Sequence, residues 1–100
     1  KFSLPSWFGF MITLNPNSPF TRKEFVDYLH QHNVGTRMFM AGNVIKQPYF
    51  QTYDIKYRNG DLTKTDYALE NCVWIGVHQG IDKPRREYMA KVLEDFLKQY

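Results

Sequence analysis

The stretch GTRMFMAGNVIKQPYF, residues 35–50, combines a short strand, a tight turn and a bend. Residues 35–40 alternate as a strand, Ala-Gly-Asn at 41–43 is typical of a turn, and the bend ends in Pro-Tyr-Phe. An arginine, an asparagine, a lysine and a glutamine lie here among aromatic residues. Arg37 is a forked, permanently charged donor, and the two amides both donate and accept hydrogen bonds. This mixture favours contact with a polar, anionic ligand over burial in a dry core.

Three segments outside this stretch also alternate in the manner of strands. Residues 7–14 carry apolar side chains on both faces, which is typical of a central strand. Residues 73–78 form another strand, in which alternate valine and isoleucine side chains point inward. Residues 51–58 are predicted as either a strand or an extended loop.

The remaining apolar periodicity predicts three helices. The first begins at Thr21, which forms a capping box with Glu24, and it ends near Asn33, a residue that tolerates a left-handed conformation. The other two cover about 63–71 and 82–97. The order of strands and helices predicts an α/β (α+β) two-layer sandwich with a small sheet.

Length and composition restrict the class of protein. The 100 residues form a single domain, 1–100, and 43% hydrophobic residues suffice for one core. The net charge of +3 is scattered apart from one cluster at 83–86, so we expect no nucleic-acid partner. Cys72 is the single cysteine, which favours a reducing compartment, and no long apolar run indicates a membrane segment. We therefore expect a cytoplasmic protein without a membrane partner.

Four side chains are candidate ligand contacts: Arg37, Asn43, Gln47 and His78. A lone charge inside a short strand needs a partner or a ligand. For Arg37 the alternative to a ligand is a buried salt bridge with an acid such as Asp54 or Asp66.

The other three candidates have structural alternatives as well. Asn43 and Gln47 can simply cap their turn, and His78 is either a pocket wall or a solvent-facing loop residue. The chain has no Gly-rich phosphate loop and no zinc-type spacing of Cys and His. From its residues alone, the chain lacks the parts for independent catalysis, and we predict no catalytic residue, cofactor site or metal site in it.

Several short segments together resemble a known family. They follow one another along nearly the whole chain: SWFGF and ITL within 6–14, GTR at 35–37, AGN at 41–43, QPYF at 47–50, LT and TD within 62–66, and WIG at 74–76. The combination resembles the C-terminal domain of the sugar-nucleotide 3-dehydratases of the DegT/DnrJ/EryC1 family. Within that family, the nearest resemblance is to the branch that acts on CDP-4-keto-6-deoxyglucose in 3,6-dideoxyhexose and O-antigen biosynthesis.

The resemblance implies a division of labour between two domains. Relatives of this kind are fold-type-I enzymes that use PLP or PMP, held in a large N-terminal domain with a histidine base. A small C-terminal domain, with a mainly antiparallel sheet, helps to close the sugar-nucleotide cleft. This chain would be that small domain, binding no cofactor and inactive when isolated, and its start at Lys1 rather than Met agrees with a fragment.

The resemblance also implies partners. The parent enzyme would be a homodimer, and the CDP-linked branch adds a [2Fe–2S] cluster and a reductase, whereas the GDP-linked branch needs neither. Arg37, Asn43 and Gln47 correspond to a polar motif that faces the sugar nucleotide. Two alternatives stay open: a DegT-type sugar aminotransferase domain, and a free-standing ligand-binding or protein-interaction module.

Overall fold

A three-stranded antiparallel sheet lies at the centre of the computed structural model, which describes residues 4–53, 55–56 and 60–100. The strands are β1 (Gly9–Thr13), β2 (Thr36–Met38) and β3 (Cys72–Gly76), in the order β1-β3-β2. The helical elements, in chain order, are α1 (Arg22–Gln31), the 3₁₀ helix η1 (Val44–Lys46), α2 (Pro48–Thr52), α3 (Thr63–Asn71) and α4 (Lys83–Leu97).

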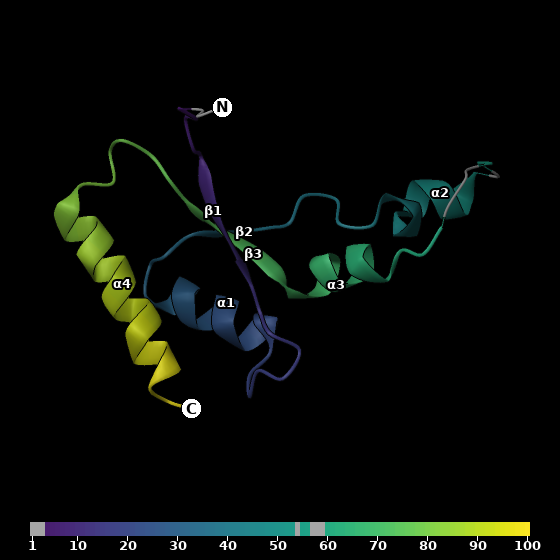
Figure 1. Cartoon of the computed structure of the whole chain (residues 1–100). Coiled ribbons are helices and arrows are strands. Elements are labelled where there is room, and N and C mark those ends of the chain that lie inside the picture. Colours follow the sequence, from purple (N-terminus) through teal and green to yellow (C-terminus); the bar gives the residue numbers. More distant parts are fainter. Residues whose placement is uncertain (1–3, 54, 57–59) are drawn as a thin grey trace.

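The core lies between the sheet and two of the helices. Figure 1 shows α1 and α4 next to each other on one side of the sheet. The side chains of Leu29, Val73 and Phe96 are at most 2% exposed there. In the register of the sheet, Val73 of β3 lies opposite Ile12 and Met38, so one face of the sheet is apolar. The predicted sandwich therefore has its second layer on that face.

The helix ends follow their local signals. Thr21 caps α1 through the predicted capping box with Glu24, and Asn33 has the left-handed φ of 57° just beyond the helix. Asp82 caps α4 by accepting a hydrogen bond from the Arg85 N–H. The structure confirms these predictions. A cap depends only on residues within about one turn of the helix, so the local sequence is enough to predict it.

The prediction of a central strand at 7–14 is wrong. β1 lies at an edge of the sheet, and β3 is the central strand. Cys72, Val73 and Ile75 are buried, whereas Phe10 of β1 is 61% exposed. Apolar side chains on both faces of a strand therefore do not indicate a central position here, because those of β1 remain exposed.

The structure also corrects the expectation for 48–58. Residues Pro48–Thr52 form α2, so the described residues contain four α-helices and not the expected three. Pro48 is at the first helical position, where its fixed φ fits and its missing N–H costs nothing. Tyr53 belongs to the alternating segment 51–58, but it also lies four residues after Tyr49, as neighbours on a helix do, and their ring centroids are 4.9 Å apart. Residues 54 and 57–59 of the predicted segment lie outside the described residues.

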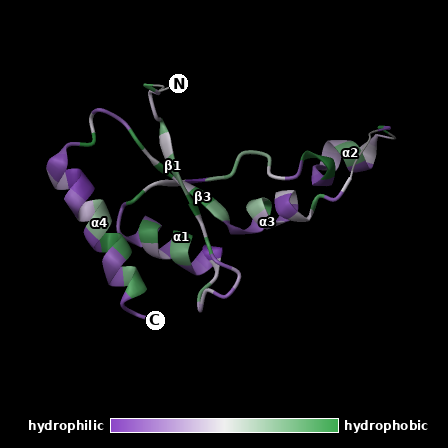
Figure 2. Cartoon of the chain, viewed as in Figure 1, coloured by the Kyte–Doolittle hydropathy of each residue, from purple (hydrophilic) through white to green (hydrophobic). Residues whose placement is uncertain are grey.

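A projecting segment makes this chain less compact than an ordinary domain of the same length. Figure 1 shows residues 40–53, here called the arm, carrying η1 and α2 away from the sheet. The radius of gyration is 16.7 Å, against about 13 Å for a compact domain of this length. Figure 2 shows hydrophobic residues at η1 as well as in the sheet and in α1. None of the helices in the described part of the chain has the length and apolar character needed to cross a membrane.

Candidate functional site

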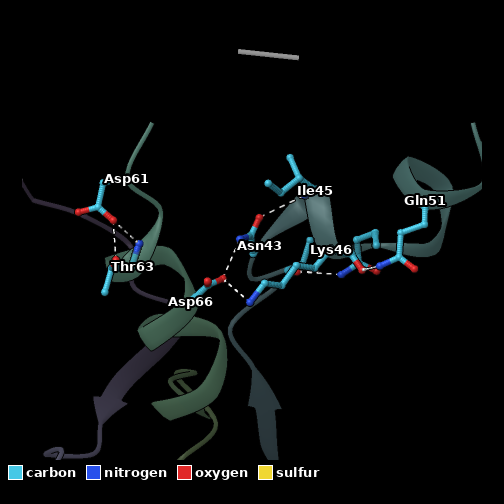
Figure 3. A network of polar contacts seen from close by, with 9 residues as sticks. Asn43, Ile45, Lys46, Gln51, Asp61, Thr63 and Asp66 are labelled. Atoms are coloured by element: carbon cyan, nitrogen blue, oxygen red, sulfur yellow. Dashed lines mark hydrogen bonds and ion pairs between the residues drawn. The ribbon is translucent and has the colours of Figure 1, made fainter. Parts of the chain in front are cut away.

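A polar cluster around the buried side chain of Asn43 joins the base of the arm to α3. Asn43 is 2% exposed, and its Oδ1 accepts a hydrogen bond from the Ile45 N–H at 3.2 Å, which caps η1. Its Nδ2 donates to Asp66 Oδ1 at 2.7 Å, and Lys46 Nζ lies 2.9 Å from the same oxygen (Figure 3). The hydrogen bonds from Asn43 and then Lys46 hold the pKa of Asp66 below its ordinary value. Asp66 therefore stays ionised and ties the turn to the helix.

The turn between β2 and η1 packs directly on α3. Gly42 has a φ of +59°, and a Cβ on it would lie 2.1 Å from Cδ1 of Leu69. Only glycine satisfies both the backbone and the space at this position. Gln47 closes the turn from the other end, where its Nε2 donates to the Ala41 carbonyl at 2.9 Å. The capping roles considered for Asn43 and Gln47 are both present.

Arg37 is exposed on β2, and its guanidinium forms no hydrogen bond or ion pair with any residue that the structure describes. The alternative salt bridge with Asp66 is absent, because that carboxylate is bound by Asn43 and Lys46. The other acid considered, Asp54, lies outside the described residues. The Arg37 guanidinium is thus available to an anion.

A wall of aromatic rings lies beside Arg37. Trp74, the residue opposite Arg37 in the sheet, stacks against Phe8 and Phe39 with ring centroids 5.5 and 6.1 Å away. Gly9 makes room for this ring, since a Cβ there would lie 2.7 Å from Trp74 Cε3. Arg37, Trp74 and Phe8 line a groove of about 620 Å³. The groove offers a flat apolar wall and a guanidinium that is unpaired among the described residues, a combination that suits an anion with a ring.

His78 lies in a different place. It follows the end of β3, and its Nδ1 accepts a hydrogen bond from the Gly80 N–H at 3.0 Å. It lines a separate groove of about 380 Å³ between β1 and α4, together with Phe10 and Arg86. The four candidate residues therefore divide among the arm base, the Arg37 groove and the α4 groove, and their contact with a ligand stays a prediction.

Two features of this region escaped sequence reasoning. The first is the aromatic wall around Trp74. Its available signal was Gly9, because a glycine inside an apolar strand often marks a place where another group, here the Trp74 ring, approaches the backbone closely. The pairing of Lys46 with Asp66 was the other, and nothing local in the sequence points to it. The described residues contain no group of three or more His, Cys, Asp or Glu side chains that could hold a metal ion.

Comparison with known proteins gives one family and three curated relatives. Residues 3–94 match the model of the DegT/DnrJ/EryC1/StrS aminotransferase family. The lipopolysaccharide biosynthesis protein RfbH of Salmonella typhimurium is 43% identical over 93 residues, which cover 92% of this chain and 21% of that protein. The dTDP-4-dehydro-2,6-dideoxy-D-glucose 3-dehydratase of Saccharopolyspora spinosa is 36% identical, over 93% of this chain and 20% of that protein.

The third relative and a solved structure concern one kind of enzyme. The GDP-4-keto-6-deoxy-D-mannose 3-dehydratase of Yersinia pseudotuberculosis is 31% identical over 74% of this chain and 19% of that protein. The structure of the E. coli GDP-4-keto-6-deoxy-D-mannose-3-dehydratase with bound hydrated PLP matches with a TM-score of 0.68 and 25% identity, over 85% of this chain and 22% of that one. The chain thus spans about a fifth of the length of these proteins.

These likenesses confirm the predicted fold class, a small domain with an antiparallel sheet like that of fold-type-I PLP-dependent transferases. They agree with the expected 3-dehydratase relatives. The expected closeness to the CDP-linked branch is not confirmed, because the named nucleotides are dTDP and GDP.

Proposed function

Because the chain belongs to the DegT/DnrJ/EryC1/StrS aminotransferase family, we propose that it is the C-terminal small domain of a longer sugar-nucleotide 3-dehydratase that uses PLP or PMP. Two curated relatives are named as 3-dehydratases of nucleotide-linked sugars, and they are about five times longer than this chain. In this proposal the reaction removes the C3 hydroxyl of CDP-4-keto-6-deoxyglucose. The isolated domain has no activity of its own, since the reactive groups belong to the larger part of the polypeptide.

The role proposed for this domain is to hold the sugar nucleotide, and the single observation that carries it is the state of Arg37. Its guanidinium is exposed and unpaired among the described residues, beside the Trp74 wall. A guanidinium can bind a phosphate through two parallel hydrogen bonds, so a diphosphate is a suitable ligand. The side-chain Oε1 of Gln47 has no partner among the described residues and can accept a hydrogen bond from a sugar hydroxyl, while Asn43 acts by holding the turn in place.

The described residues do not fit a site for the cofactor itself. A PLP phosphate is commonly held by free N–H groups at a helix N-terminus. Here the side chains of Thr21 and Asp82 already cap α1 and α4, Asp61 accepts a hydrogen bond from the Thr63 N–H at the start of α3, and Lys46 is paired with Asp66. Cys72 is the single cysteine, whereas a [2Fe–2S] cluster takes four protein ligands. We therefore assign the cofactor, the histidine base, the cluster of a CDP-linked enzyme and the surfaces for dimer and reductase to the larger part.

The test of this role is Arg37→Ala in the full-length polypeptide that contains the chain. Loss of a charge-assisted hydrogen bond is worth about 1.5–3 kcal/mol, so we expect kcat/KM for the sugar nucleotide to fall roughly 10- to 100-fold. The melting temperature should not change, because Arg37 has no partner among the described residues. Lys91→Ala on α4 removes another exposed cation and serves as the control. Unchanged catalytic efficiency with a melting temperature several degrees lower would show a structural role instead.

A second candidate, a sugar aminotransferase, is favoured by the description of the family that residues 3–94 match. The two reactions differ in their products: a dehydratase yields a sugar without the C3 hydroxyl, and an aminotransferase yields an amino sugar. Mass spectrometry of the product formed with and without an amino donor separates them. A lysine in place of the histidine base in the larger part of the polypeptide would favour the aminotransferase.

A further inference from the structure

The chain exposes more surface than a domain of its size normally does. Its solvent-accessible surface is 8,314 Å², whereas a compact monomer of 11.9 kDa exposes about 6,000 Å². The difference of roughly 2,300 Å² exceeds the area of about 800 Å² that one partner contributes to an ordinary protein–protein interface. A surface of this size needs a partner as large as a domain, because a peptide or a small ligand would cover only part of it.

The arm contributes an apolar part of this surface. Neither η1 nor α2 contains a buried residue, and α2 packs mainly against η1. Four of the arm's apolar or aromatic side chains are between 53% and 75% exposed: Met40, Val44, Tyr49 and Tyr53. Tyrosines of this kind are enriched at protein interfaces, where they provide large contact areas.

The arm is nevertheless held in a defined position at its base. The contacts of Asn43 and Lys46 with Asp66 fix the turn from which the arm projects (Figure 3). The close approach of Gly42 to Leu69 fixes it as well. Beyond that base, α2 has five residues, and a helix of this length is not stable in water without tertiary support. A fixed base below an end whose apolar side chains are exposed indicates a segment that completes its packing on another surface.

We infer that the arm is a docking surface for the larger part of the same polypeptide, with Tyr49 and Tyr53 as its anchors. This inference rests on the proposed function, which places the chain in a protein about five times longer. The relatives that match across the arm have about four fifths of their length outside the matched region, which is enough for a partner of the required size. A second copy of this domain is the alternative occupant that the experiments exclude or reveal.

The first experiment measures hydrogen exchange in the full-length polypeptide. The Tyr53 amide, which donates to the Tyr49 carbonyl, should exchange at least about 100-fold more slowly than in an unstructured peptide. Tyr49→Asp should remove most of that protection. Leu4→Asp is the control, since Leu4 is a fully exposed apolar residue outside the arm, and it should leave the arm protected. Unprotected arm amides in the unsubstituted protein, or full protection in the Tyr49→Asp variant, would overturn the inference.

The second experiment identifies what the arm contacts. Tyr49 is replaced by p-benzoylphenylalanine, and the adducts formed under light are mapped by mass spectrometry. We expect them on peptides outside these 100 residues and within the same gene product. Adducts on the equivalent 100 residues of a second copy, or on another protein, would contradict the docking.

The two proposals can fail separately. A polypeptide that dehydrates its sugar nucleotide but has an unprotected arm would contradict only the docking. A protected arm that forms the expected adducts, in a polypeptide with no dehydratase activity, would support the docking and contradict the proposed function.

Discussion

The helical side of the sheet and the arm reach their conformations by opposite means. Leu29, Val73 and Phe96 are buried between α1, α4 and the sheet, and all three are apolar. Among the described arm residues the one buried to that degree is Asn43, a polar residue held by hydrogen bonds. The first region is stabilised by surface that the chain buries on itself. The second is positioned by a few polar contacts and leaves its apolar side chains exposed.

The largest effect should come from the helical side. Phe96→Ala should lower the free energy of unfolding by about 3–5 kcal/mol, because it opens a cavity beside Phe20, Phe25 and Tyr28. Urea unfolding followed by circular dichroism measures the loss. Tyr53→Ala in the arm is the contrasting variant: in the 100-residue chain alone, where Tyr53 is exposed, it should cost less than about 0.5 kcal/mol. Equal losses in the two variants would mean that the arm is part of the cooperative core.

An intermediate effect should come from the base of the arm. Gly42→Ala should cost roughly 2 kcal/mol or more, since it combines a left-handed backbone with a clash against Leu69. Gly35→Ala is the matched control, because Gly35 has open space around its Cα and should tolerate the added methyl. Thermal unfolding of both variants makes the comparison. A Gly42→Ala protein as stable as the control would show that the turn does not depend on its packing against α3.

The smallest effect concerns Asp66 and its dependence on pH. The pKa of Asp66 is lower in the folded chain than its ordinary value, so its contribution to stability is present above pH 4 and is lost as pH falls through the depressed pKa. Asp66→Asn should remove this contribution at neutral pH and flatten the stability curve below pH 4. The effect is limited because the Asp66 side chain is 33% exposed.

The control for this pH dependence is Asp61→Asn. The pKa of Asp61 is also lowered, by hydrogen bonds from Thr63 within the same loop. Its substitution should leave the arm base intact, as seen by hydrogen exchange at Lys46. A stability curve that flattens below pH 4 more in the Asp61 variant than in the Asp66 variant would contradict the role given to the Asn43–Asp66–Lys46 cluster.

Local signals made much of the fold predictable. The capping box of Thr21 and Glu24, the cap at Asp82 and the left-handed Asn33 all act within one turn of chain, and the structure has each of them. The short helix α2 was missed because its five residues are divided between the predicted bend, which ends at residue 50, and the predicted strand or loop at 51–58. At the candidate site, the residue types alone identified the polar candidates. The sequence did not show that Asn43 and Gln47 make structural contacts while the Arg37 guanidinium stays unpaired among the described residues.

By itself the sequence determined the two periodicities, the caps, the turns and the resemblance to one family, because each depends on neighbouring residues or on order along the chain. Only the tertiary structure decided that β3 and not β1 is central, and that Asp66 binds Asn43 and Lys46 while Arg37 remains unpaired among the described residues. The physical reason is the range of the contacts. Asn43 and Asp66 are 23 residues apart, and only the packing of α3 against the turn brings them within 2.7 Å.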